Sequence, residues 1–147
     1  MRGESFGKYI AAIYRHQQIL INHQLKPYGI GSGQYIFLAN ISRNEGISQK
    51  ELSRLISIDK ATTAKALGKL EEEGYICKVR DPEDKRYHKL YLTQKGKDFL
   101  PTLREILSGI TKTLGTGMSE EQHRETINIL KLMLENAYNR VEELRNK

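Results

Sequence analysis

Two β-rich segments around one charged turn, within an otherwise helical sequence, limit most strongly how this chain can fold. The segments YICKVR (75–80) and YHKLYL (87–92) are rich in β-branched and aromatic residues, and DPEDKR lies between them. Pro82 fixes one backbone dihedral of the turn, and the carboxylates of Asp81 and Asp84 can accept hydrogen bonds from nearby backbone N–H groups. This pattern predicts a two-stranded hairpin.

Two short helices are predicted directly before this hairpin. Ser48, with Glu51 three residues later, is typical of a helix start, and Asp59 is a suitable N-cap for a second helix that ends at Gly74. Only the short sequence SID separates the two helices. Because two helices joined by about 3 to 4 residues have the spacing of a helix-turn-helix, the central segment is predicted to form a winged helix-turn-helix.

Longer helical segments flank this central unit on both sides. Apolar residues recur at helical spacing from Ser5 to Leu25, and Thr93 is expected to cap a helix that runs to about Leu114. The predicted fold class is therefore mainly α (α+β), with a two-stranded wing. The expected parts are an N-terminal helix in 1–29, a winged helix-turn-helix domain in 30–92 and C-terminal helices in 93–147.

The last predicted helix begins at Ser119 and carries an apolar stripe with the spacing of a coiled coil. The stripe consists of Ile127, Leu130, Leu134, Ala137, Val141 and Leu144. A stripe this narrow suits an interface between two helices better than the broader face that a helix presents to a globular core. We therefore predict an interface between subunits, and the alternative is packing within a single chain.

The net charge of +6, with a pI near 9.4, favours an anionic partner such as nucleic acid. The single cysteine rules out a disulfide framework within the chain and favours a reducing compartment. The apolar segment YIAAIY near the N-terminus is too short to span a membrane. We expect a cytoplasmic protein.

The residues ISQKELSRLISIDKATTAKALGKLEEEGYICKVRDPEDKRYHKLYLTQKG resemble the MarR family of bacterial and archaeal transcription regulators. The most specific parts are LEEEGYI, then Asp84-Lys85-Arg86 in the wing, and then LYLTQKG, and their order and spacing make the match strong. The resemblance covers nearly the whole chain. It implies an obligate homodimer, with an N-terminal dimerisation helix in 1–29 and C-terminal dimerisation helices in 93–147 that interlock, so that two winged helices meet a palindromic operator on double-stranded DNA.

Several basic residues are candidates for DNA contact. From Lys60 to Lys69 the second helix of the pair has three lysines and no acid, a face that suits the major groove, although such a face can also be merely solvated. Arg86 matches the arginine of the family's wing motif and can enter the narrow minor groove. The candidate DNA contacts are Ser48, Gln49, Lys60, Thr62, Thr63, Lys65, Lys69, Arg80, Lys85, Arg86 and Lys89. Thr63 also falls on the apolar face of its helix.

Asp84 is expected to order the wing by holding Arg86 or a nearby backbone amide, and the alternative is that it only forms the turn. The family commonly senses phenolic or aromatic acids, or oxidants, beside the dimer helices. The resemblance therefore suggests effector contacts at Tyr14, Arg15, His16 and Tyr35, unless these are ordinary core, interface or surface residues. Cys77 is expected to pack as a small apolar residue rather than to sense oxidants.

The predicted function is that of a dimeric transcriptional repressor that a small phenolic or aromatic effector releases from DNA. The sequence has no P-loop, and no Ser-His-Asp arrangement or metal triad stands out, so we expect neither an enzyme nor a bound cofactor. His16 and His23 lack further ligands for zinc. The alternative function is a winged-helix protein-interaction module without sequence-specific DNA binding, but the lysines and the wing arginine favour DNA.

Overall fold

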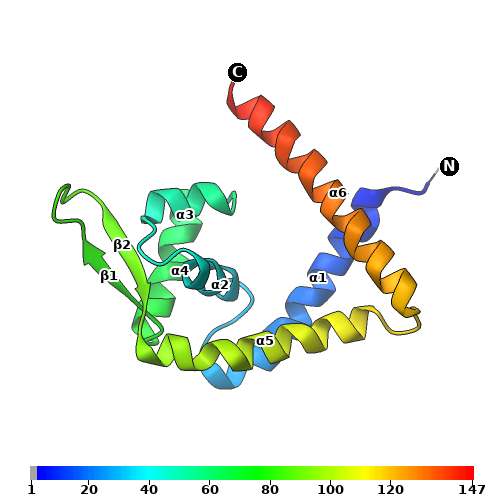
Figure 1. Cartoon of the computed structure of the whole chain (residues 1–147), viewed down its shortest axis with the longest axis horizontal. Coiled ribbons are helices and arrows are strands. Elements are labelled where there is room, and N and C mark those ends of the chain that lie inside the picture. Colours follow the sequence, from blue (N-terminus) through cyan, green and yellow to red (C-terminus); the bar gives the residue numbers. More distant parts are fainter. Residues whose placement is uncertain (1–2) are drawn as a thin grey trace. The chain divides into compact units, whose positions relative to one another are not determined.

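A computed structural model describes residues 3–147, which form a mainly helical protein with one two-stranded antiparallel sheet among these residues. The chain divides into two compact units, one up to Ile110 and one from Thr111 to Lys147. In chain order the elements are α1 (Phe6–Leu25), the 3-10 helix η1 (Lys26–Tyr28), α2 (Tyr35–Arg43), α3 (Gln49–Leu55), α4 (Lys60–Glu72), β1 (Ile76–Arg80), β2 (His88–Leu92), α5 (Gln94–Leu114) and α6 (Glu120–Arg145) (Figure 1).

The helices begin where the capping residues predict. The Ser48 hydroxyl accepts from the Glu51 backbone N–H (3.1 Å), and the Asp59 carboxylate accepts from the Thr62 backbone N–H (2.8 Å). In a full capping box the Glu51 side chain would also accept from the Ser48 backbone N–H. Here the Glu51 carboxylate accepts from the Ser48 hydroxyl instead (3.1 Å). The box at the start of α6 is complete, since the Gln122 side chain also accepts from the Ser119 backbone N–H (2.9 Å). These N-caps satisfy backbone donors that lack partners within the helix.

The end of α4 sets the start of the hairpin. Gly74 has a left-handed backbone (φ 82°). The N–H of Gly74 donates to the carbonyl of Glu71 (3.0 Å) and that of Tyr75 to Leu70 (2.9 Å), the two bonds of a Schellman motif. The chain therefore leaves α4 in a sharp, fixed turn that includes Tyr75, and β1 begins at Ile76, one residue later than predicted. The second strand also begins one residue later than predicted, at His88.

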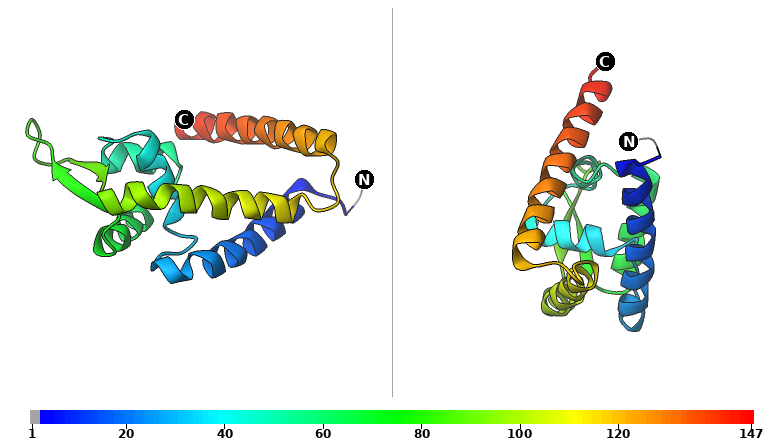
Figure 2. Two further views of the ribbon diagram at one scale, coloured as in Figure 1. Left: turned by 60° about the horizontal axis from the view of Figure 1, so that its bottom comes forward. Right: turned by 90° about the vertical axis from the view of Figure 1, so that its right-hand side faces the viewer.

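The wing, which consists of β1, β2 and the turn between them, has a defined register. Ile76 lies opposite Leu92, and Arg80 lies opposite His88. The other edge of β2 contacts the segment before α3: the N–H of Gly46 donates to the carbonyl of Leu90 (2.8 Å), and the N–H of Leu90 donates to the carbonyl of Ile47 (2.9 Å). The wing is thus fixed to the helix-turn-helix at its base, while its tip projects beyond α2, α3 and α4 (Figure 2).

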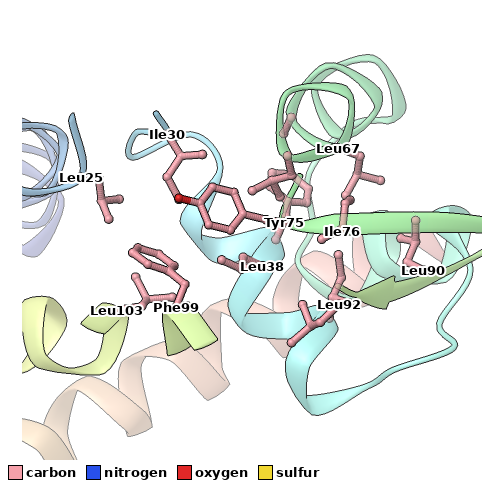
Figure 3. Packing of buried hydrophobic residues seen from close by; sticks show 14 of the residues in the cluster. Leu25, Ile30, Leu38, Leu67, Tyr75, Ile76, Leu90, Leu92, Phe99 and Leu103 are labelled. Carbon is pink, nitrogen blue, oxygen red and sulfur yellow. The ribbon is translucent and has the colours of Figure 1, made fainter. Parts of the chain in front are cut away.

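The core of the first unit joins the winged helix to α1 and to the N-terminal part of α5. Leu38, Leu67, Leu90 and Phe99, from four different elements, are all buried (Figure 3). Burial of such side chains is the main stabilising contribution to the fold.

A cluster of aromatic side chains lies within this core and at its edge. The Tyr75 hydroxyl donates to the Tyr28 carbonyl (2.6 Å), and both rings pack at a tilt against Phe99, with centroids 5.2 and 4.9 Å away. A Cβ at Gly96 would overlap the backbone oxygen of Tyr75. The glycine of the LTQKG segment therefore permits α5 to pack closely on the start of the hairpin.

In the second unit, no side chain of α6 is buried. The apolar stripe predicted from the heptad spacing is solvent-exposed, and Leu134 in its middle is 70% exposed. Ile129 and Leu132, which the heptad pattern did not include, are also exposed apolar residues on this helix.

Candidate nucleic-acid interface

The second helix of the helix-turn-helix, α4, has one buried and one exposed face. Ala66, Leu67 and Leu70 are buried, whereas Lys60 and Lys65 are exposed. The buried face anchors α4 to the core, so the opposite face is free to meet a partner.

Thr63 belongs to the buried face of α4, and its place among the candidate DNA contacts was wrong. Its side chain is 0% exposed, and its hydroxyl donates to the Ile58 carbonyl over a distance of 3.5 Å. Helical periodicity places residue 63 in line with Leu67 and Leu70. Thr63 therefore supports the turn between α3 and α4 and cannot reach a base.

The exposed face of α4 also carries three small residues that the sequence reasoning did not single out. Ala61 and Ala64 are exposed and Gly68 is half-buried. At 100° per residue, these positions lie on the same side of the helix as Lys65. Side chains this small allow a close approach of the helix backbone to a partner.

Thr62 is held at the start of α4. Its hydroxyl donates to the Asp59 carboxylate (2.8 Å), which also accepts from its backbone N–H. These two hydrogen bonds lower the pKa of Asp59 below its usual range, and the bond from the Thr62 backbone N–H has the larger effect. The side chain of Thr62 is therefore fixed in orientation on the exposed surface.

The two lysines in the middle of α4 differ in their surroundings. Lys69 forms an i,i+4 ion pair with Glu73 (3.3 Å). Among residues 3–147, Lys65 has no carboxylate at salt-bridge distance. Lys65 therefore presents a less compensated charge than Lys69.

At the tip of the wing, Asp84 holds Arg86 through three hydrogen bonds. The Asp84 carboxylate accepts from the Arg86 backbone N–H (3.1 Å), from Nε (3.0 Å) and from Nη2 (2.8 Å). The contact lowers the pKa of Asp84 and raises the pKa of Arg86, in each case chiefly through the side-chain hydrogen bonds between them. The Arg86 side chain is 82% exposed, so the remaining guanidinium N–H groups face solvent.

The rest of the turn is also ordered by local hydrogen bonds. The N–H of Asp81 donates to the Tyr87 carbonyl (3.0 Å), and its carboxylate accepts from the Glu83 N–H (2.9 Å). The Arg86 guanidinium lies 5.8 Å from the centroid of the Tyr87 ring. The turn thus has a defined shape without a partner.

The other wing cations lie on different sides of the hairpin. Arg80 shares a face with its cross-strand partner His88, whereas Lys89, opposite Val79, lies on the other face. Lys85 is exposed at the turn. The structure therefore does not gather Arg80 and Lys89 on one surface.

A pocket of about 280 Å³ lies between α3, the start of α4 and the wing. It is lined by Gln49, Lys50, Ser53, Lys60, Arg86, Tyr87 and His88. Gln49, Lys60 and Arg86 were candidates from the sequence, but Lys50 and His88 were missed. Strand pairing could have predicted that His88 lies beside Arg80. No pattern in the sequence predicts that α3 packs next to the wing and brings Lys50 to the same pocket. Ser48 does not line this pocket, and its hydroxyl is used in capping α3.

The four effector candidates do not come together. The pKa of Tyr35 is raised first by burial and then by its electrostatic interaction with Tyr14. Arg15 and His16 follow Tyr14 on α1 at steps of 100°, so they point in other directions. His16 also shares a hydrogen bond with the Ala12 carbonyl through Nδ1 (2.7 Å).

Gln18, one helical turn after Tyr14, was not singled out from the sequence. Its amide Nε2 donates to the Tyr14 hydroxyl (3.2 Å), and its Oε1 is buried without a hydrogen-bond partner among the described residues. A buried acceptor without a partner is costly, so Gln18 Oε1 is an exception among the buried polar atoms of the described residues.

Cys77 is exposed, so the expectation of apolar packing was wrong. It alternates with buried Ile76 and therefore lies on the outer face of the hairpin, opposite Tyr91. In residues 3–147 there is no group of three or more His, Cys, Asp or Glu side chains arranged for a metal ion. None of the helices in that range has the length and hydropathy that a membrane span requires.

Comparisons with known proteins agree with this geometry. The model of the MarR family matches residues 28–86. The chain is 36% identical over 121 residues to the HTH-type transcriptional regulator YybA of Bacillus subtilis (strain 168). The matched region covers 82% of this chain and 80% of that protein. It is 29% identical over 124 residues to the HTH-type transcriptional regulator BilQ of Clostridioides difficile (strain CD3), covering 84% of each.

Solved structures show the same fold. A MarR transcriptional regulator from Methanosarcina mazei Go1 is 43% identical and superposes with a TM-score of 0.88, covering 90% of this chain and 96% of that one. The transcriptional regulator SlyA is 28% identical with a TM-score of 0.88, covering 96% of this chain and 99% of that one. The similarity therefore extends over the terminal helices as well as the winged helix.

Proposed function

The chain belongs to the MarR family of transcriptional regulators, and we propose that it acts as a homodimeric repressor that binds a palindromic operator through α4 and the wing. In this proposal α4 enters the major groove with Lys65 and the small residues around it, and Arg86 enters the adjacent minor groove. Backbone phosphates are contacted by Lys60, Lys69 and Lys85.

The observation that carries the proposal is the contact between Asp84 and Arg86 at the wing tip. An arginine on a free loop would lose conformational entropy when it binds, whereas Arg86 is already held in one orientation. Asp84 occupies only some of the N–H donors of Arg86, so the guanidinium keeps other N–H groups for an acceptor. An ordered cation at the end of a hairpin suits the concentrated negative potential of a narrow minor groove.

The exposed stripe on α6 supports the proposed dimer. Leucines and valines at coiled-coil spacing are rarely left in water on a stable monomer, and a second copy would bury them. Two-fold symmetry of the protein would then match an inverted repeat in the DNA, with half-sites about one helical turn apart.

We further propose that a small phenolic effector binds beside Tyr14 and Tyr35. A phenol ring would pack against the two tyrosine rings, next to Gln18, whose amide Nε2 donates to the Tyr14 hydroxyl. Binding would shift the dimer towards a spacing of the winged helices that does not fit the operator. A hundred-fold loss of DNA affinity would require about 2.7 kcal/mol of coupling.

Selection of bound duplexes from a random-sequence pool tests the proposal. The full-length protein should enrich an inverted repeat, and the enrichment should fall when a phenolic acid such as salicylate is added. Gln18→Leu should retain DNA binding and lose the response to the phenolic acid. A protein-interaction module without DNA specificity would return the starting pool unchanged, which would contradict the proposal.

A further inference from the structure

The exposed face of α4 offers a partner few side chains that form hydrogen bonds. At 100° per residue, Ala61, Ala64, Lys65 and Gly68 lie together at the centre of this face. The next residue on the same side is Glu72, at the C-terminal end of the helix. Of the four central residues only Lys65 has a polar side-chain atom, so the remaining surface consists of methyl groups and backbone.

Gly68 leaves open space on this face that no packing within the chain requires. A Cβ at this position would meet no side chain and no other element of the described residues within 4 Å. A glycine inside a helix is destabilising, because it loses more conformational freedom on folding than any other residue. The space therefore suits close approach of a partner to the helix, which short methyl side chains need in order to make contact.

Thr62, at the edge of the same face, presents a methyl group in a fixed position. Its hydroxyl donates to the Asp59 carboxylate (2.8 Å), and its backbone N–H donates to the same carboxylate (2.8 Å). With Oγ1 held in this way, the side chain keeps one staggered rotamer, which fixes the Cγ2 methyl as well. Because Thr62 is exposed and its O–H is already used, its free feature is this methyl group.

The bases of DNA differ in what they require from a side chain in the major groove. Adenine is read by Asn or Gln, cytosine by Glu or Asp, and guanine by Arg or Lys. Residues 60–68 contain no Asn, Gln, Glu or Asp, and Lys65 is the match for guanine. The methyl groups of Ala61, Thr62 and Ala64 match the remaining feature of the groove, which is the C5-methyl group of thymine.

We propose that α4 selects its DNA sites chiefly through thymine methyl groups, which contact the fixed methyl of Thr62 and the methyls of Ala61 and Ala64. The inference rests on the proposed function, because it requires α4 to enter the major groove. It adds the chemical feature that this helix reads. Such contacts carry no charge, so they contribute to sequence preference without contributing to the salt dependence of binding.

The test removes single methyl groups from the DNA. Each thymine of the selected duplex is replaced in turn by deoxyuridine, which lacks only the C5-methyl group, and affinity is measured by fluorescence anisotropy. The quantity compared is the ratio of affinities for the thymine and uracil duplexes, so effects of a variant on overall affinity cancel. The wild type should lose about fourfold at one or more thymines of each half-site, as expected when one methyl-sized group returns to water. The loss should be equal at all salt concentrations.

Two substitutions separate the methyl group of Thr62 from its hydroxyl. Thr62→Ser retains the hydroxyl and removes the methyl, so the ratio at one thymine should fall from about fourfold to about one. Thr62→Val retains a methyl and should keep the ratio. Ala61→Gly and Ala64→Gly should each lower the ratio at another thymine. Thr116→Ser removes a methyl from an exposed threonine outside α4 and should behave as the wild type.

A second measurement places cytosine or 5-methylcytosine at the position that responds to Thr62. These two duplexes differ only in the methyl group, and the methylated one should bind about fourfold more tightly. If an inverted repeat is selected but uracil duplexes bind as tightly as thymine duplexes, the inference is wrong and the proposed function stands. If no duplex is enriched, both are wrong. A ratio that Thr62→Ser leaves unchanged at every thymine would overturn the role of Thr62.

Discussion

Asp84 and Arg86 form a closed pair at the tip of the wing, with the guanidinium 3.0 Å from one carboxylate oxygen through Nε and 2.8 Å from the other through Nη2. A two-pronged contact of this kind fixes the plane of the guanidinium as well as its position. Because both side chains belong to one turn, the pair needs no contact from the rest of the fold. The wing can therefore present an oriented cation before any DNA arrives.

Replacing Arg86 with alanine should weaken binding to the operator by roughly 5- to 150-fold without affecting assembly. The reason is the loss of the side chain proposed to enter the minor groove. Binding is measured by anisotropy titration, and mass in solution by light scattering. Arg104→Ala removes the same charge from the exposed surface of α5 and should change affinity only slightly. Equal losses in the two variants would point to net charge rather than to the wing.

Asp84→Asn separates the ordering of Arg86 from simple electrostatics. The substitution removes one negative charge next to the DNA, so long-range attraction alone would strengthen binding. We expect weaker binding, by about three- to tenfold, since Arg86 loses its fixed orientation and must be ordered on the DNA. Tighter binding by this variant would mean that Asp84 forms the turn and has no further role.

The same contact should depend on pH in the acid range. Contact with Arg86 lowers the pKa of Asp84 below the ordinary value of 3.8. Its contribution is therefore fully present above pH 3.8 and is lost as the pH falls through the lower folded value. The Arg86 Nε–H signal in NMR should stay constant from pH 7 to 4 and change only below that range. A change centred above pH 4 would show that the pair does not form in solution.

Lys65→Ala should cost more DNA affinity than Lys69→Ala. Lys69 is paired with Glu73 and must give up or share that contact, whereas Lys65 has no such competitor among the described residues. Lys65→Ala should lower the magnitude of the salt slope by about 0.9 for each subunit that contacts a phosphate. Titrations at four salt concentrations provide the slopes. Glu73→Gln should make Lys69 more available, and an unchanged affinity in that variant would rule out a phosphate contact by Lys69.

Leu134→Glu should convert the dimer into a monomer. The side chain lies in the middle of the exposed stripe of α6, and two glutamates facing each other would be buried without partners. Sedimentation equilibrium measures the mass, which should fall by about half. Asn139→Glu places the same charge on the other side of α6 and should leave the dimer intact. A wild-type protein that is itself a monomer at micromolar concentration would contradict the proposed interface.

Features set by short stretches of chain could be predicted from the sequence. The N-caps at Ser48, Asp59 and Ser119, and the hairpin around Pro82, depend on residues no more than a few positions apart. The contact between Asp84 and Arg86 belongs to the same class. Local hydrogen bonds of this kind form almost independently of tertiary context.

Features that depend on packing between distant segments were less predictable. Thr63 has a side chain suited to either face of a helix. Periodicity aligns it with Leu67 and Leu70, but the packing around it shows that its side chain is fully buried. Cys77 is exposed because Ile76 takes the inward position on β1. The pocket that joins Lys50 to His88 requires three elements to meet, and no local pattern encodes that meeting.

Hydroxyl-radical footprinting of the selected duplex, with the wild type and Arg86→Ala side by side, tests the central claim most directly. The wild type should protect two minor-groove segments related by two-fold symmetry, flanking major-groove contacts about one helical turn apart. In Arg86→Ala the outer minor-groove protections should disappear while the central pattern remains. A single asymmetric footprint, or a footprint that Arg86→Ala leaves unchanged, would contradict a dimer that binds DNA through its wings.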